Sequence, residues 1–146
     1  LVVKAGALAC QIREHLHLAM PGYAGLFDRL FESPTALVIA ARCDSPAKLI
    51  KLGRNRLSRY LSKNKVRHQL RTLDKVLAWA AQAANDPIQD GPMHHAIWTD
   101  LHTLYQLFQR QIKALERQLA SDLVQTPYVR LMAIPGINVV SAAELA

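Results

Sequence analysis

One apolar stripe at helical spacing runs through residues 97–123 and constrains the fold more than any other feature. Its members recur on average about every 3.7 residues, the period of a long and nearly straight α-helix. A second stripe, in residues 66–84, follows strict steps of 4 and 3, which is the spacing of a coiled-coil seam. No segment alternates apolar and polar residues between turn signals as a strand does. The sequence therefore predicts an all-α fold.

A turn-rich linker at residues 86–92 separates the two stripes. Because helices joined by a short loop pack side by side, we expect residues 63–125 to form a long antiparallel coiled-coil-like hairpin within a helical bundle. Trp79 and Trp98 are expected to pack across this hairpin. Residues 1–62 would form a region of shorter helices with a basic end, and residues 126–146 the truncated start of a further domain.

The shorter helices are bounded by recognisable cap residues. An amphipathic helix over residues 5–19 is expected to end at Pro21-Gly22. Ser33-Pro34 and Ser45-Pro46 each place an N-cap serine before a proline at the first helical position. Gly53 is expected to end the second of these helices, with another short helix following it up to about Ser62.

Positive charge is concentrated in the N-terminal half of the chain. Residues 1–75 contain fourteen basic and five acidic residues, whereas residues 76–146 contain four and six. Residues 45–73 contain nine basic residues and no acidic one, a bias that predicts contact with a polyanion. Their spacing of three or four residues favours helix faces that bind the nucleic-acid backbone. The alternative is a helix face that is only solvated. These candidate contacts are Lys48, Lys51, Arg54, Arg56, Arg59, Lys63, Lys65, Arg67 and Arg71.

The tail contains a candidate helix-hairpin-helix-like turn. Apolar residues flank Pro135-Gly136 between two short predicted helices. Gly136 permits a turn with positive φ, and the first N–H groups of the second helix can face a phosphate. Pro-Gly also ends ordinary helices, so that alternative remains. The candidate nucleic-acid contacts in this turn are Gly136, Ile137, Asn138 and Val139.

The longer helix of the expected hairpin extends beyond its partner. Its last apolar residues would stay uncovered, and such a stripe favours dimerisation. The alternative is that the N-terminal helix covers the stripe within the same chain. The candidate dimerisation residues are Ile112, Leu115, Leu119 and Leu123.

No catalytic or metal-binding pattern is present in the sequence. There is no glycine-rich phosphate loop, nucleophile elbow or pair of carboxylates at a useful spacing. His94, His95 and His102 are interpreted as solvated histidines, because no acidic or cysteine residue completes a ligand set. We expect neither a cofactor nor a metal in this chain. The two isolated cysteines and the lack of long apolar runs indicate a reducing cytoplasm and no membrane partner.

The succession of these segments resembles the middle of the insertion sequence 110/116/902 family of transposases. The order and spacing are similar over most of the chain, and the segments are Met20-Pro21-Gly22, Ser33-Pro34-Thr35-Ala36-Leu37, Ser45-Pro46-Ala47-Lys48-Leu49, Leu52-Gly53-Arg54-Asn55-Arg56-Leu57, Leu131-Met132-Ala133-Ile134-Pro135-Gly136-Ile137 and Ser141-Ala142-Ala143. The resemblance implies three parts: a ribonuclease-H-like domain with four metal-binding acidic residues, a helical coiled-coil region, and a C-terminal domain with a nucleophilic serine. It also implies a divalent metal, Mg²⁺, in the full-length protein, and a structured guide RNA.

The catalytic residues implied by the resemblance lie outside this sequence, which begins with Leu1 and stops inside a predicted helix. The acidic residues Asp28, Glu32, Asp44 and Asp74 do not occupy the family's acidic motifs, so no catalytic role is carried onto them. We therefore expect part of a bacterial or archaeal, nucleoid-associated transposase that binds DNA and dimerises without being active by itself. Two alternatives are a stand-alone helix-hairpin-helix module that binds DNA or RNA and a structural coiled-coil adaptor.

Overall fold

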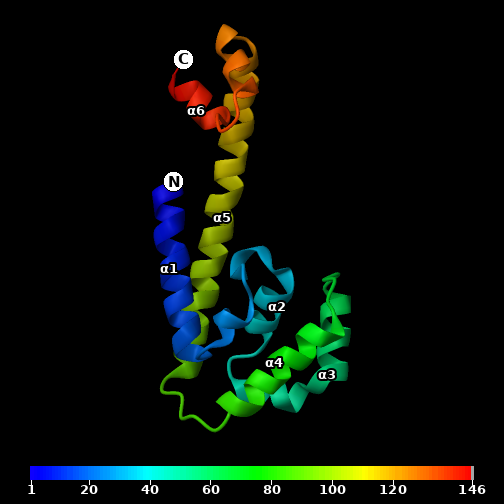
Figure 1. Ribbon diagram of the computed structural model, residues 1–146. Helices are drawn as coiled ribbons and strands as arrows, with labels where there is room; N and C mark the ends of the chain where they lie inside the picture. Colours follow the sequence, from blue (N-terminus) through cyan, green and yellow to red (C-terminus); the bar gives the residue numbers. More distant parts are fainter. Residues whose placement is uncertain (146) are drawn as a thin grey trace. The chain divides into compact units, whose positions relative to one another are not determined.

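A computed structural model describes residues 1–145, and every regular element among them is a helix (Figure 1). The expected all-α class is confirmed. In chain order, the α-helices and the 3₁₀ helices, labelled η, are α1 (Val2–Ala19), η1 (Tyr23–Leu26), η2 (Leu30–Glu32), α2 (Pro34–Arg42), α3 (Pro46–Lys63), α4 (Leu70–Ala83), α5 (Gly91–Val124), η3 (Pro127–Ala133) and α6 (Val139–Glu144).

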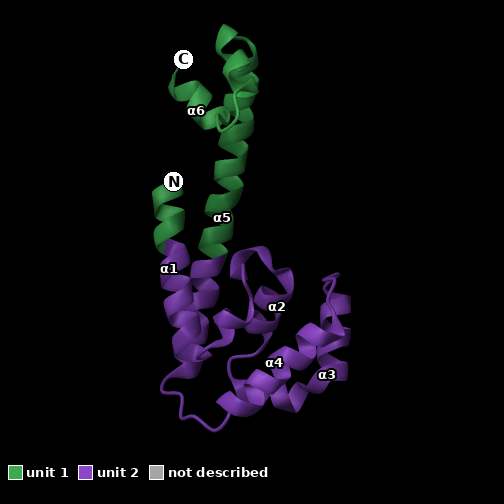
Figure 2. Ribbon diagram, in the orientation of Figure 1, with its two compact units in different colours: residues 1–7, 103–146 green, residues 8–102 purple. Residues whose placement is uncertain are grey.

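The chain divides into two compact units (Figure 2). Unit 1 comprises residues 1–7 and 103–146, and unit 2 comprises residues 8–102. Helices α1 and α5 each contribute residues to both units. The boundaries of the units therefore differ from those of the expected regions 1–62, 63–125 and 126–146. Ala146, the last residue of the third region, lies outside the described residues.

Three helix ends of unit 2 fall where the cap residues predict them. The apolar face of α1 is buried, and the helix stops just before Pro21-Gly22, where Gly22 has a φ of 80°. Ser33 Oγ accepts a hydrogen bond from the N–H of Ala36 at 3.3 Å, which starts α2. Ser45 Oγ accepts one from the N–H of Lys48 at 3.4 Å, which starts α3. The two predicted serine caps are confirmed.

Helix α3 kinks at Gly53 instead of ending there. Gly53 has a φ of 68° and a ψ of 169°, and the helix resumes at once and continues to Lys63. The expected helix end at Gly53 is therefore wrong. The second half continues because Leu57 and Leu61 on its inner face are both fully buried, so helical geometry there is stabilised by packing.

Replacing Gly53 with alanine is expected to lower the free energy of unfolding by about 1–3 kcal/mol. The space around a new Cβ is open, but this pair of φ and ψ values is adopted almost only by glycine. Gly25→Ala is a matched control, because its new Cβ also meets open space while its φ is not positive. Urea denaturation of both variants measures the difference, and equal midpoints would contradict the strain at Gly53.

The helical hairpin of unit 2 is formed by α3 and α4, joined by residues 64–69 (Figure 1). The partner that follows α4 along its length is α3 and not α5, so the expected pairing of residues 66–84 with 93–123 is wrong. The heptad spacing survives with a different set of members, since Leu70 and Ala84 are exposed. Short loops flank α4 on both sides, and each allows an antiparallel neighbour. The buried members of α4 are Leu73, Val76, Ala80 and Ala83.

The two tryptophans do not pack across the expected hairpin. Trp79 on α4 donates its Nε1–H to the carbonyl oxygen of Pro21 at 3.0 Å and meets the ring of Tyr23 edge-on. Trp98 is fully buried near the start of α5, between two histidine rings of its own helix. Trp79 therefore attaches α4 to the segment that follows α1, whereas the two ring contacts of Trp98 lie within α5.

The histidines near the start of α5 pack against unit 2 instead of being solvated as expected. His95 Nε2 lies 2.9 Å from the carbonyl oxygen of Ala40, and His94 Nδ1 lies 3.0 Å from His15 Nδ1 on α1. Burial lowers the pKa of His102. These side chains attach the first turns of α5 to α1 and α2.

Unit 1 contains the turn that was expected to resemble a helix-hairpin-helix. Gly136 has the expected positive φ, at 89°, between η3 and α6, which pack against each other. The first helix is a 3₁₀ helix, however, and α6 has only six residues. Asn138 caps α6, because its Oδ1 accepts a hydrogen bond from the N–H of Ser141 at 2.9 Å.

Candidate nucleic-acid interface

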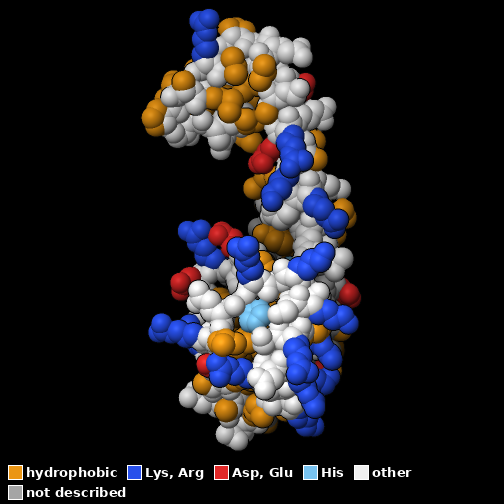
Figure 3. All heavy atoms as spheres, turned by 90° about the vertical axis from the view of Figure 1, so that its right-hand side faces the viewer, with side chains coloured by type: hydrophobic (Ala, Val, Ile, Leu, Met, Phe, Trp, Pro, Cys, Tyr) orange, Lys and Arg blue, Asp and Glu red, His pale blue; other side chains and the backbone are white. Residues whose placement is uncertain are grey.

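Residues 45–73 are here called the basic segment. All nine of its basic side chains are exposed on unit 2. Six lie on α3, two lie in the loop of residues 64–69, and one lies in the first turn of α4. In Figure 3, Lys and Arg side chains gather over the lower part of the molecule, on the side where α3 faces the viewer. The hairpin of α3 and α4 thus presents cations from three consecutive parts of the chain.

The amphipathic character of α3 causes this exposure. Its apolar residues Leu49, Leu57 and Leu61 are fully buried, so the remaining faces of the helix carry its lysines and arginines into solvent. Arg56, Arg59 and Lys63 follow one another at three and four residues in the half after the kink. They are therefore neighbours along one side of the helix, where a phosphate backbone can contact them in turn.

Two members of the basic segment form ion pairs within the described residues. Lys48 bonds to Asp44, which immediately precedes the segment. Arg54 Nε lies 3.2 Å from Asp74 Oδ1 on α4. Both pairs are partly exposed, so solvent screens them. The spacing of four residues could have indicated the first pair, whereas the second follows only from the packing of α4 on α3.

The single tyrosine of the basic segment is already in contact with an arginine. The guanidinium of Arg42, at the end of α2, lies over the ring of Tyr60 with its Cζ 5.6 Å from the ring centroid. This cation–π contact occupies a face of the ring on which an unpaired base could stack. The arrangement favours contacts with phosphates over stacking on bases.

The tail turn is a poorer phosphate site than the sequence predicted. The side chain of Asn138 already accepts a hydrogen bond from one N–H of the first turn of α6, so that N–H is not free for a phosphate. The four candidate residues of this turn are Gly136, Ile137, Asn138 and Val139. A helix of six residues also has a small dipole with which to attract an anion. The basic segment remains the stronger candidate.

Comparisons with known proteins give no relative for this chain. No family model, curated protein or solved structure matches it. Within residues 1–145, no group of three or more His, Cys, Asp or Glu side chains is placed to hold a metal ion. None of the helices described here combines the length and apolar character that crossing a membrane requires.

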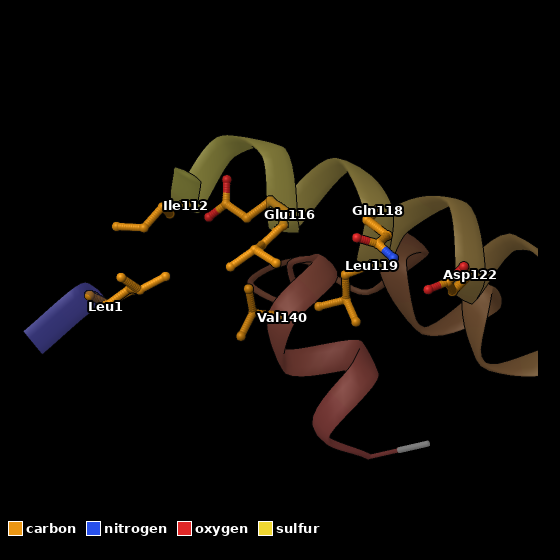
Figure 4. Close-up of a pocket in the computed structure, with 9 residues that line it drawn as sticks. Leu1, Ile112, Glu116, Gln118, Leu119, Asp122 and Val140 are labelled. Atoms are coloured by element: carbon orange, nitrogen blue, oxygen red, sulfur yellow. The ribbon is translucent and has the colours of Figure 1, made fainter. Parts of the chain in front are cut away.

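The candidate dimerisation residues differ in their exposure within unit 1. Leu115 is 53% exposed, whereas Leu123 is only 3% exposed and is thus covered by its own chain. Ile112 and Leu119 line an open apolar groove of about 480 Å³ in unit 1. Figure 4 shows them on α5, with Val140 of α6 and Leu1 at the other wall. Leu123 is therefore removed from the predicted interface, because a buried side chain cannot face a second copy.

The N-terminal residues cover this stripe only in part. Leu1 and Val2 line the groove together with Ile112 and Leu119, as in the alternative in which the N-terminal helix covers the stripe. Leu115, on the same helix, stays more than half exposed in spite of these neighbours. The structure thus leaves a shorter apolar surface than expected.

Proposed function

We propose that the chain binds nucleic acid by contacting its phosphate backbone through the basic segment. The observation that carries this proposal is that all nine cations are exposed in a stretch without any acidic residue. Surfaces that are only solvated normally mix both signs of charge. Arginine and lysine spaced along one side of a helix neutralise phosphates without reading bases.

Salt-dependent binding to duplex DNA tests this proposal. Two duplexes of equal length and unrelated sequence should bind with similar affinity, measured by fluorescence anisotropy. The logarithm of the association constant should fall linearly with the logarithm of the salt concentration, by roughly 0.9 for each phosphate contacted. A strong preference for one duplex, or affinity that does not change with salt, would contradict backbone contact.

We propose further that this nucleic-acid contact serves DNA-mediated transposition, as part of an insertion sequence 110/116/902 family transposase. The support is the succession of sequence segments together with the basic helical region. In this role the chain positions DNA. The structured guide RNA and Mg²⁺ would be bound by the full-length protein. The genomic sequence on either side of the segment that encodes this chain tests the proposal. In the same reading frame, it should encode four acidic residues upstream and a serine motif downstream. A frame that lacks both favours the alternative, a stand-alone helical module that binds DNA or RNA.

A second copy of the chain is the proposed partner for the apolar surface of α5. Leu115→Asp is expected to convert dimers to monomers, because a carboxylate in an apolar contact is strongly destabilising. Gln106→Asp is the matched control, since it adds the same residue to an exposed position of α5 about half a turn away from Leu115 around the helix. Sedimentation measures the mass, and circular dichroism should show that both variants keep their helices. Wild-type protein that is monomeric at high concentration would refute the partner.

A further inference from the structure

A small cavity of about 190 Å³ lies where α2 ends and α3 begins in unit 2. Four of the six side chains that line it are cations, and none is acidic. At roughly 30 Å³ for each water of the liquid, the cavity has room for about six water molecules, which is ample for a hydrated phosphate group. The residues of this cavity, here called the α2–α3 pocket, are Arg42, Cys43, Lys48, Lys51, Leu52 and Arg56.

Arg42 brings the fourth cation from outside the basic segment. It is the last residue of α2, and its guanidinium is held over the ring of Tyr60 on α3. Because this contact restrains a long and flexible side chain, less entropy is lost when the guanidinium binds a ligand. Arg42 is thus positioned for binding before any ligand arrives.

The other charges at the α2–α3 pocket leave it strongly positive. Asp44 does not line the pocket, and it balances one cation by bonding to Lys48. Burial acts to raise the pKa of Asp44, but the hydrogen bonds and charges of its neighbours, those of Lys48 foremost, together lower it. Burial raises the pKa of the Cys43 thiol, which therefore stays neutral. One carboxylate thus balances one of the four cations, and an anion in the pocket would relieve the repulsion among the cations.

The kink in α3 falls between two lining residues, Leu52 and Arg56. A helix that restarts leaves the first N–H groups of its new turn without acceptors of its own. The half of α3 that restarts here, Arg54–Lys63, is long enough to have a dipole that favours an anion at its beginning. The second half of α3 therefore begins within the stretch that lines the pocket.

We infer that the α2–α3 pocket holds one phosphate of the nucleic-acid backbone, with Arg42 as a contact residue that the basic segment does not include. The inference rests on the proposed function, because it takes the ligand to be a phosphodiester. It fixes one point of the backbone relative to α3, and the remaining cations of the basic segment then follow the strand on either side.

Inorganic phosphate is the first probe of the pocket. Phosphate should shift the backbone amide NMR signals of residues around the pocket in a saturable way, against chloride at the same ionic strength. Arg42→Gln and, separately, Arg56→Gln should each weaken this binding by about tenfold, the effect of losing one charge-assisted hydrogen bond. Lys113→Gln is the matched control, since it removes an exposed helical cation outside both the pocket and the basic segment and should leave phosphate binding unchanged. Circular dichroism confirms that each variant is folded.

Duplex DNA then distinguishes the source of the phosphate. In Arg42→Gln the salt dependence of duplex binding should decrease by about 0.9, one phosphate contact. If the duplex binds but Arg42→Gln changes neither its salt dependence nor phosphate binding, the pocket is wrong and the proposed function stands. If inorganic phosphate binds and the duplex does not, the ligand is a free phosphate compound, and both the phosphodiester and the proposed function are wrong.

Discussion

Replacing Arg54, Arg56 and Arg59 together with glutamine is expected to flatten the salt dependence of duplex binding by about two to three units. All three side chains are exposed on α3 after the kink. The lower value holds if Arg54 keeps its ion pair with Asp74 in the complex, because that pair competes with a phosphate. The triple substitution should lower the affinity for the duplex by several powers of ten at low salt. The loss should be smaller at high salt, where counterion release contributes less.

The triple variant has a matched control in unit 1. Arg110, Lys113 and Arg117 are also exposed on an α-helix, and their replacement by glutamine changes the net charge by the same amount. The salt dependence should stay at the wild-type value in this control. A slope that is unchanged in the Arg54, Arg56 and Arg59 variant would move the contact to the turn at residues 136–139.

Trp98→Ala is expected to lower the free energy of unfolding by about 3–5 kcal/mol, which is the range for removing a fully buried tryptophan. Trp98→Phe should cost much less, because the indole Nε1 is buried and has no hydrogen-bond partner among the described residues. Exchanging an unsatisfied N–H for an apolar ring edge sacrifices no hydrogen bond. Urea denaturation, followed by circular dichroism, measures both changes.

Trp79→Phe provides the comparison for the indole N–H. Its Nε1–H is bonded to the carbonyl oxygen of Pro21, so this variant loses a hydrogen bond as well as ring area. It should cost about 1 kcal/mol more than its lost area alone accounts for. Equal losses from Trp98→Phe and Trp79→Phe, after allowing for exposure, would contradict the unsatisfied state of Trp98.

Local features of the fold could be predicted from the sequence, and the partners of the helices could not. The caps at Ser33 and Ser45 and the positive φ of Gly136 depend on neighbouring residues alone, so the sequence predicts them. Helix α4 has a short loop on each side, so either α3 or α5 could pack antiparallel to it. The pairing with α3 depends on which neighbour presents a matching apolar face. A heptad pattern carries no information about that choice.

The candidate site divides in the same way. The nine cations are visible in the sequence because they lie within one stretch that has no acidic residue, and helical periodicity explains the exposure of those on α3. Arg42 and Asp74 lie outside the basic segment and reach it only through the packing of α2 and α4 against α3. Residues that a fold brings together from different helices leave no local signal.

Helix α5 has a consequence for how the chain folds. Its first turns are attached to α1 and α2 within unit 2 by His94 and His95, while no residue from 103 to 122 is buried. An exposed helical stretch gains little from packing, so its formation depends on a nucleus made elsewhere. The helical order of residues 103–122 therefore depends more on continuity with the preceding turns of α5 than on packing of their own side chains.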